Sequence, residues 1–333
     1  MAFGETVFPD EAERFKRFAE EIAGIQSERA KKQGAAPERV MHAKHHLGAV
    51  GELLVSATHG AQVGVFAETG KKWPVYVRFS NGSGLHQGDK DPDVRGFALK
   101  LVGVPGAKLI AGLEQELTQD FLFIDAPVLP FRNPDEFMIF VRAAKDGPFK
   151  LLPRLISGFG FGRAFGILKG SLMAEKVESF ATHAFHTAAP IAFGSTAAKL
   201  ALVPVPGVAP AAPPSGRDYL RRDLTSRLQQ GSLSWSLRAQ PFVDQSSTPI
   251  EDTAVVWSGP WVELGTLRLP RQDPESPRGQ EISALVSQLS FDPWHATEEH
   301  RPLGAIMRAR GATYGASVMG RSAAAEPKTV LSP

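Results

Sequence analysis

A strictly alternating run in the first quarter of the chain constrains the fold most. In Lys72–Ser80, KWPVYVRFS, the residues at positions 75, 77 and 79 are apolar, and Arg78 and Ser80 fall on the opposite side. A period of two is typical of a strand with one buried face. We therefore expect a strand that buries its apolar face and offers Arg78 and Ser80 together on the other.

Further elements surround this strand. The strand-like stretches are FALKLVGV, FLFI, Phe193–Val203, SLSWSLRAQPFV and TAVVWSGPWVELGTLRLP. The helical stretches are Pro9–Gln33, Phe131–Lys145, RDYLRRDLTSRLQQ and Pro277–Leu289, and the glycine-containing stretch Pro148–Ser179 is helical and loop-like. Central strands with helices before, between and after them indicate an α+β protein and not a regular βαβ succession. An antiparallel barrel decorated with helices accommodates this order.

Composition excludes several classes of site. The chain has no cysteine, which rules out disulfides, iron–sulfur clusters, thiolate-ligated haem and cysteine nucleophiles. Its 37 basic and 35 acidic residues nearly balance, and no basic aromatic strip predicts a nucleic-acid partner. Neither a signal peptide nor an uncharged run of membrane-spanning length is evident. We therefore expect a cytoplasmic protein whose site uses His, Tyr, Ser or carboxylates.

The stretch Leu289–Arg321 carries the strongest chemical signal. If its second half is helical, Arg310, Tyr314 and Arg321 lie on one stripe, together with Met307. A guanidinium beside a phenol stabilises the phenolate, and a phenolate is an oxygen ligand for ferric iron. On spacing alone, an arginine stacked on a surface tyrosine is the commoner arrangement.

Three segments resemble those of haem catalases. QLSFDPWHATEEHRPLGAIMRARGATY is similar to a catalase segment that reads Q-L-x-F-D-P and later R-x-x-x-Y. PERVMHAK is nearly identical to the catalase P-E-R-V-x-H-A-K, and VRFSNGSG with DPDVRGFALKL resembles V-R-F-S followed by D-x-R-G-F-A-x-K. The resemblance spans most of Pro37–Leu101 and Gln288–Arg321. It identifies the chain as a member of the haem catalase superfamily, similar to the small catalase-related haem peroxidases of bacteria.

The resemblance assigns roles to particular residues. It implies haem b (iron protoporphyrin IX), with Tyr314 as the iron ligand and Arg310 bonded to the tyrosine oxygen. It makes His42 the distal base and Ser80 the hydrogen-bond partner of that base. The haem propionates would be bound by three arginines from separate segments, namely Arg39, Arg78 and Arg321. Without a ligand, such like charges repel one another and are costly to desolvate.

One position departs from the catalase pattern. Catalases have an asparagine that helps to orient peroxide, and the corresponding residue here is Thr118, with Gln119 adjacent. We expect Thr118 to be the third catalytic residue, and the loss of the amide predicts weak disproportionation of hydrogen peroxide. Phe121 and Phe123 are candidates for the wall of the distal pocket, although core packing is the commoner role for phenylalanine.

The resemblance also implies the architecture. We expect an eight-stranded antiparallel β-barrel with surrounding helices, without the long N-terminal arm and the C-terminal helical domain of full catalases. The expected parts are an N-terminal helix (1–36), a haem-binding barrel domain with helical insertions (37–321) and a flexible tail (322–333).

The function implied is that of a haem peroxidase. It would reduce hydrogen peroxide or organic hydroperoxides through an oxo-ferryl intermediate, with a small-molecule reductant, weak catalase activity and a homo-oligomeric (dimeric) assembly. Two alternatives stay open: a haem enzyme that rearranges fatty-acid hydroperoxides, like an allene oxide synthase, and a non-enzymatic barrel that binds a hydrophobe. For His42, a metal site shared with His45 and His46 is a further alternative, although HxxHH is a weak zinc pattern.

Overall fold

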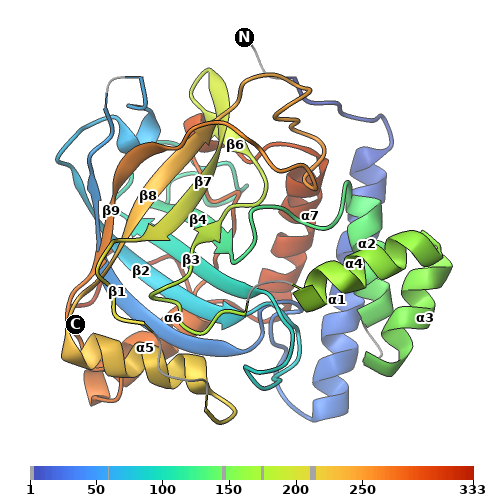
Figure 1. Cartoon of the computed structure of the whole chain (residues 1–333), viewed down its shortest axis with the longest axis horizontal. Helices are drawn as coiled ribbons and strands as arrows, with labels where there is room; N and C mark the ends of the chain where they lie inside the picture. The colour runs from blue at the N-terminus through green and yellow to red at the C-terminus, as the bar shows by residue number, and fades with distance from the viewer. Residues whose placement is uncertain (1–3, 59, 145–147, 174–175, 211–214) are drawn as a thin grey trace.

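The β-sheet of this protein closes on itself. The structure, a computed structural model, describes residues 4–58, 60–144, 148–173, 176–210 and 215–333. The strands pair antiparallel in the order β5-β4-β3-β2-β1-β9-β8-β7-β6, and an additional pairing of β5 with β7 closes the ring. Eight strands therefore form the barrel, and β6 extends it beside β7 (Figure 1). The expected eight-stranded antiparallel barrel with helices is confirmed.

The elements have the following bounds. The strands are β1 His45–Val55, β2 Lys72–Asn81, β3 Arg95–Val102, β4 Thr118–Ile124, β5 Phe185–His186, β6 Ile191–Phe193, β7 Thr196–Pro204, β8 Leu233–Pro241 and β9 Val262–Leu269. The α-helices are α1 Glu11–Gln33, α2 Pro134–Ala144, α3 Pro148–Phe159, α4 Phe161–Met173, α5 Tyr219–Gln230, α6 Pro277–Gln288 and α7 Ala305–Gly320. Two short 3-10 turns are η1 Gly64–Phe66 and η2 Glu298–His300.

The inner face of the barrel is the main core. Phe79 of β2 pairs with Phe97 of β3, which pairs with Phe123 of β4, and all three side chains are buried in one cluster. The Phe97 ring packs edge-on against Trp235 of β8 with the ring centroids 5.1 Å apart. Burying one such ring contributes about 2 kcal/mol. Arg78 and Ser80 alternate with these core residues and lie on the outer face, as the period of two predicts.

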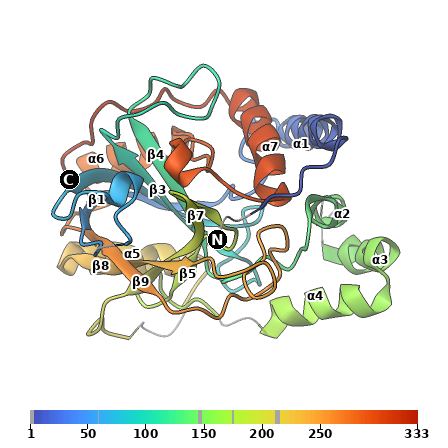
Figure 2. The same ribbon diagram turned by 90° about the horizontal axis from the view of Figure 1, so that it is seen from above.

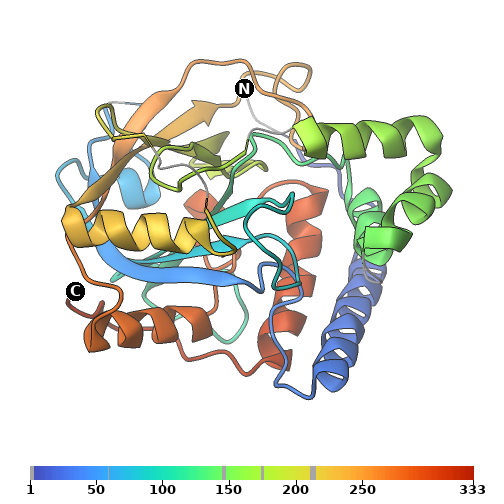
Figure 3. The same ribbon diagram turned by 60° about the horizontal axis from the view of Figure 1, so that its bottom comes forward.

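Helices cover part of that outer face. Phe15, Phe18, Ile22 and Ile25 of α1 recur at helical spacing and pack in one cluster with Ala309 of α7. Figures 1 and 3 show α7 between the barrel and α1.

No helix among the described residues is both long enough and apolar enough to cross a bilayer.

Helix α6 packs on the outer side of β1. A Cβ atom on Gly48 would lie 2.5 Å from the Val286 side chain. Glycine is therefore what allows this helix to approach the strand closely.

The segment 322–333, predicted to be a flexible tail, is instead bound along the outer face of the barrel. Glu326 is buried and its carboxylate lies 2.7 Å from Nζ of Lys100 on β3. The backbone N–H of Leu331 donates to the Tyr76 hydroxyl at 3.0 Å. The small, polar composition of the segment gave no sign of these partners, because both lie far away in the sequence.

Candidate functional site

The outer face of β2–β4 presents two rows of residues toward α7. The register places Ser80 beside Gly96 and Gly96 beside Ile124 in one row. In the next row Arg78 lies beside Ala98, and Ala98 beside Leu122. Leu122 and Arg310 of α7 line the same small cavity, so this part of β4 faces α7. The two rows are mostly small or apolar, with Arg78 and Ser80 as the polar exceptions.

His42 lies over the first row, in the loop between α1 and β1. Its Nδ1 forms a 3.0 Å hydrogen bond with Oγ of Ser80, as the resemblance implied. Its backbone N–H donates to the Gly82 carbonyl at 2.8 Å, and its carbonyl accepts from Nη2 of Arg78 at 2.7 Å. The φ angle of His42 is 57°, a left-handed conformation that is uncommon for a residue with a side chain. Hydrogen bonds on both sides of the residue hold this strained backbone in place.

Sequence reasoning missed the role of Gly96 in this arrangement. A Cβ atom at Gly96 would lie 2.6 Å from both Nδ1 of His42 and Oγ of Ser80. Only glycine leaves room for the His42–Ser80 pair on β3. A glycine inside the strand-like run RGFALKL was the signal that could have indicated a close approach here.

The surroundings of His42 favour its neutral form. Burial, followed by repulsion from the charges of Arg78, Arg310 and Arg39, lowers the pKa of His42 to about 3. The imidazole is therefore neutral at pH 7 and can accept a proton.

Two of the three predicted arginines, Arg39 and Arg321, meet at the end of α6. Nη2 of Arg39 and Nη2 of Arg321 both donate to the Leu289 carbonyl, at 2.6 and 3.0 Å. Arg39 also donates to Ser287 O, and Arg321 to Gln288 O. These carbonyls belong to a helix C-terminus, whose partial negative charge favours cations.

Of the three arginines, Arg78 has the charge that is least compensated by hydrogen bonds. Its Nε is buried without a hydrogen-bond partner. Burial and repulsion from Arg321 lower the pKa of Arg78 to about 9, although Tyr314 acts in the opposite direction. Burial also lowers the pKa of Arg321 to about 10, and burial with repulsion from Arg78 and Arg321 lowers that of Arg39. Among the described residues, none of the three forms an ion pair with a carboxylate.

The predicted tyrosine ligand lies on α7 with its arginine. Nη2 of Arg310 donates to the Tyr314 hydroxyl at 2.7 Å, and the guanidinium lies 5.0 Å from the centre of the tyrosine ring. Nε1 of Trp294 donates to the Met307 carbonyl at 2.6 Å. A Cβ atom on Gly311 would meet the Trp294 indole at 3.0 Å, so this glycine admits the indole against α7.

The face of α7 around Tyr314 remains accessible. Tyr314 and Arg310 are only half-buried, as is His42 on the opposite side. Among described atoms, none lies within 4 Å of a Cβ position on Gly315. The electrostatic influence of Arg310 on His42 and of Tyr314 on Arg78 shows that the two sides of the site are close neighbours.

These observations test whether a haem would fit. A haem carries two carboxylates, and the structure offers a buried, unpaired guanidinium N–H beside two further arginines that lack carboxylate partners. Tyrosine is one of the ligands that bind haem iron through oxygen, and the Tyr314 hydroxyl has a guanidinium bonded to it. The residues present fit the group.

The structure does not bring Thr118 to this site. Thr118 pairs with Val102, six residues along β3 from Gly96, which is roughly 20 Å away. Its hydroxyl bonds Nε2 of His295 and a carboxylate oxygen of Glu326, at 2.9 Å each. Gln119 points to the other side of β4, where its Oε1 accepts from the Thr297 backbone N–H. The register of β4 against β3, which local sequence does not reveal, places both residues away from His42.

The shared metal site of His42, His45 and His46 is not formed. His45 bonds Oγ of Ser283 at 3.0 Å and His46 bonds Oδ1 of Asn81 at 2.7 Å, so the three rings serve different partners. Among the described residues there is no group of three or more His, Cys, Asp or Glu side chains able to hold a metal ion.

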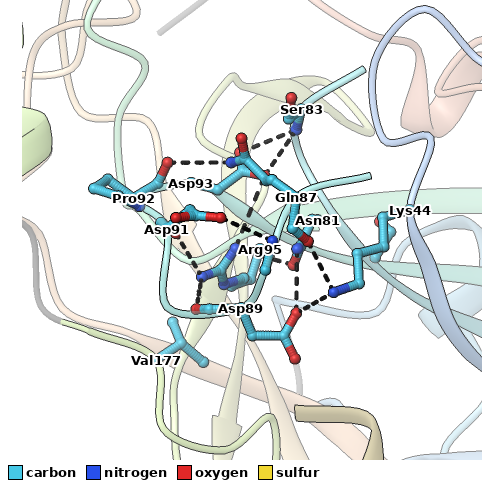
Figure 4. A network of polar contacts seen from close by, with 12 residues as sticks. Lys44, Asn81, Ser83, Gln87, Asp89, Asp91, Pro92, Asp93, Arg95 and Val177 are labelled. Atoms are coloured by element: carbon cyan, nitrogen blue, oxygen red, sulfur yellow. Dashed lines mark hydrogen bonds and ion pairs between the residues drawn. The ribbon is translucent and has the colours of Figure 1, made fainter. Parts of the chain in front are cut away.

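A buried polar network supports the loop that follows β2 (Figure 4). Oδ1 of Asn81 accepts from Nη1 of Arg95 at 2.9 Å, and Arg95 also donates to the Asp89 carbonyl. Nζ of Lys44 lies 2.6 Å from the Asp89 carboxylate. The loop carries the Gly82 carbonyl that accepts from His42, so the network helps to position the histidine.

Comparison with known proteins gives a consistent result. The protein-family model "Catalase" matches residues 16–161. A catalase-related peroxidase of Mycolicibacterium paratuberculosis is 29% identical over 264 residues, which cover 75% of this chain and 78% of that protein. Catalase A of Staphylococcus xylosus is 28% identical over 292 residues, covering 77% of this chain but only 56% of that protein. A fungal catalase structure superimposes with a TM-score of 0.69 at 19% identity, over 89% of this chain and 61% of the other.

Proposed function

The chain belongs to the catalase superfamily, and on that premise we propose that it is a haem-dependent peroxidase for hydrogen peroxide and organic hydroperoxides, with weak catalase activity. The observation that carries this proposal is the set of Arg39, Arg78 and Arg321, which form no ion pair with a described carboxylate and lie beside Tyr314 and opposite His42. A buried cationic cluster of this kind is unfavourable unless an anionic ligand completes it.

The residues around the site would divide the work of holding haem b. Tyr314 would ligate the iron through its oxygen, and Arg310, whose Nη2 donates to that oxygen at 2.7 Å, would hold it in position. Arg39, Arg78 and Arg321 would bind the propionates through charge-assisted hydrogen bonds. When bound, haem supplies an iron centre that accepts one oxygen of the peroxide and stores two oxidising equivalents.

His42 would move the proton during cleavage of the peroxide. The Ser80 hydrogen bond occupies Nδ1 and leaves Nε2 as the reacting nitrogen. Because its pKa is about 3, the neutral ring can take a proton from the bound peroxide oxygen and return it to the departing oxygen. Over a turnover, a hydroperoxide would take two electrons from an external reductant and two protons to give one alcohol and one water, and hydrogen peroxide would give two waters.

The neighbourhood of His42 favours peroxidase over catalase activity. The β3 and β4 positions in its two rows are Gly96, Ala98, Ile124 and Leu122, none of which carries an amide. With Thr118 elsewhere, no side chain from these rows orients a second hydrogen peroxide molecule. The same apolar rows suit the hydrocarbon of an organic hydroperoxide. A fatty-acid hydroperoxide added without a reductant tests the rearrangement alternative, because formation of an epoxide or ketol would favour it.

The visible spectrum of the purified protein, with hemin added where necessary, tests the proposal. We expect a Soret band with high-spin ferric character, and we expect Tyr314→Phe to lose it or alter it strongly. Tyr219→Phe is the matched control, because Tyr219 is a buried tyrosine that donates to the Val177 carbonyl away from the site. His42→Ala should retain haem but slow peroxide cleavage by about a hundredfold or more. Failure of the wild type to take up hemin would refute the proposal.

A further inference from the structure

Helices α3 and α4 form a hairpin that carries charge of only one sign. Residues 147–173 include Lys150, Arg154, Arg163 and Lys169 and no aspartate or glutamate. Basic and acidic residues are nearly balanced over the whole chain, 37 against 35, so this stretch is a local exception. Most of its other residues are phenylalanine, leucine, isoleucine or glycine. Such a basic, apolar composition is typical of helices that lie at a membrane interface.

Two aromatic rings project from this hairpin. Phe161 is 71% exposed and Phe165 is 55% exposed. They lie four residues apart on one side of α4, and their rings stack with the centroids 6.2 Å apart. Gly162 and Gly166 follow them in sequence, with no described atom within 4 Å of either Cβ position. The rings therefore form a protruding apolar pair, and exposed apolar groups of this kind mark interaction surfaces.

Other faces of the hairpin are already packed. Leu155 of α3 and Ala164 of α4 are buried in one cluster with Ala143 of α2. Arg163 forms an ion pair with Glu136 of α2. Figures 2 and 3 show α2, α3 and α4 grouped at one side of the molecule, away from the barrel. The internal packing thus holds the hairpin so that Phe161 and Phe165 point outward.

We propose that the α3–α4 hairpin docks on the surface of an anionic lipid bilayer. Phe161 and Phe165 enter the boundary between headgroups and acyl chains, and the excess of basic over acidic residues in 147–173 favours an anionic surface. The absence of acidic residues from 147–173 removes repulsion from those phosphates. A second copy of this chain fits less well, because it would bring another basic, acid-free hairpin against the first.

The test is co-sedimentation of the whole purified protein with vesicles of phosphatidylcholine, with and without phosphatidylglycerol. We expect binding to the anionic vesicles and weaker binding at high salt. The double substitution Phe161→Ser with Phe165→Ser should lower the partition coefficient about a hundredfold, roughly tenfold for each ring. Phe161→Leu with Phe165→Leu should keep most of the binding, because it preserves apolar area.

Val256→Ser is the matched control. Val256 is 62% exposed but lies outside the hairpin, so its loss should leave vesicle binding unchanged. Equal thermal unfolding of all variants shows that the fold is intact. The proposal is overturned if the wild type stays in the supernatant with anionic vesicles, or if the double serine variant binds them as well as the wild type. A dimer that the serine variant dissociates, without vesicle binding, would assign the surface to a second copy instead. None of these readouts depends on haem or on peroxide chemistry.

Discussion

Replacing Arg78 by methionine should make the haem-free protein more stable while weakening its affinity for haem. The Arg78 guanidinium is buried, one of its N–H groups has no partner, and burial with repulsion from Arg321 lowers its pKa from the ordinary arginine value to about 9. That fall means that the folded state disfavours the charged guanidinium by roughly 5 kcal/mol relative to the unfolded state. The substitution also removes the hydrogen bond to the His42 carbonyl, about 1.5–3 kcal/mol. The net expectation is a gain of about 2 kcal/mol in the free energy of unfolding.

The sign of the pH dependence provides a second check. Because the folded-state pKa of Arg78 is depressed, its unfavourable contribution is fully present below about pH 9 and is relieved as the pH rises from there toward the ordinary arginine pKa. The stability difference between Arg78→Met and wild type should therefore be constant across neutral pH.

Urea unfolding of the haem-free proteins, followed by circular dichroism, measures the stability, and hemin titration at the Soret band measures the affinity. The loss of one buried charged partner should weaken hemin binding by about thirtyfold or more. Arg271→Met is the control, because Arg271 is exposed and, among the described residues, its guanidinium donates to the Gln229 carbonyl away from the site. A haem-free Arg78→Met protein less stable than wild type, or one that binds hemin equally well, would refute the reasoning.

Three other predictions follow from contacts near and beyond the site. For the peroxide step, kcat/KM should stay level from about pH 8 down to about pH 5, because the His42 pKa is about 3; a fall with an apparent pKa near 6.5 would contradict this. Gly96→Ala should slow peroxide cleavage by about tenfold or more and lower the free energy of unfolding by about 1–3 kcal/mol, because its Cβ would crowd His42 and Ser80. Gly231→Ala is the control and should be neutral in the same assays, because no described atom lies within 4 Å of its Cβ position. Glu326→Gln should cost about 3 kcal/mol at pH 7. Burial opposes ionisation of Glu326, but His295 and Lys100 hold its pKa well below the usual range. The loss in the free energy of unfolding should therefore shrink below about pH 4.5 in chemical denaturation. A loss that is constant with pH would count against this prediction.

Local patterns in the sequence predicted the parts of the site that depend on periodicity. The alternation in β2 correctly placed Arg78 and Ser80 on one face, and spacing by four placed Arg310 beside Tyr314 on α7. Both results depend only on the geometry of a single strand or helix. The resemblance to catalases supplied the barrel, which periodicity alone does not distinguish from other antiparallel folds.

The errors arose where distant segments decide the outcome. Thr118 has a polar side chain on the expected strand, but the pairing of β4 with β3 sets it six residues from Gly96. Glu326 looked like part of a solvated tail, yet its partner Lys100 lies 226 residues earlier. Neither partner is visible in a window of neighbouring residues, so both required the tertiary structure.

The binding of residues 322–333 to the barrel bears on the order of assembly during synthesis. Strands β1 to β4 leave the ribosome long before Glu326, Val330 and Leu331, which pack on their outer side. Until those residues emerge, the Tyr76 hydroxyl lacks its partner at Leu331, and Lys100 lacks one of its two carboxylates. A tag fused directly after this segment, or a protease that trims it, should therefore affect the yield of folded protein more than its surface position suggests.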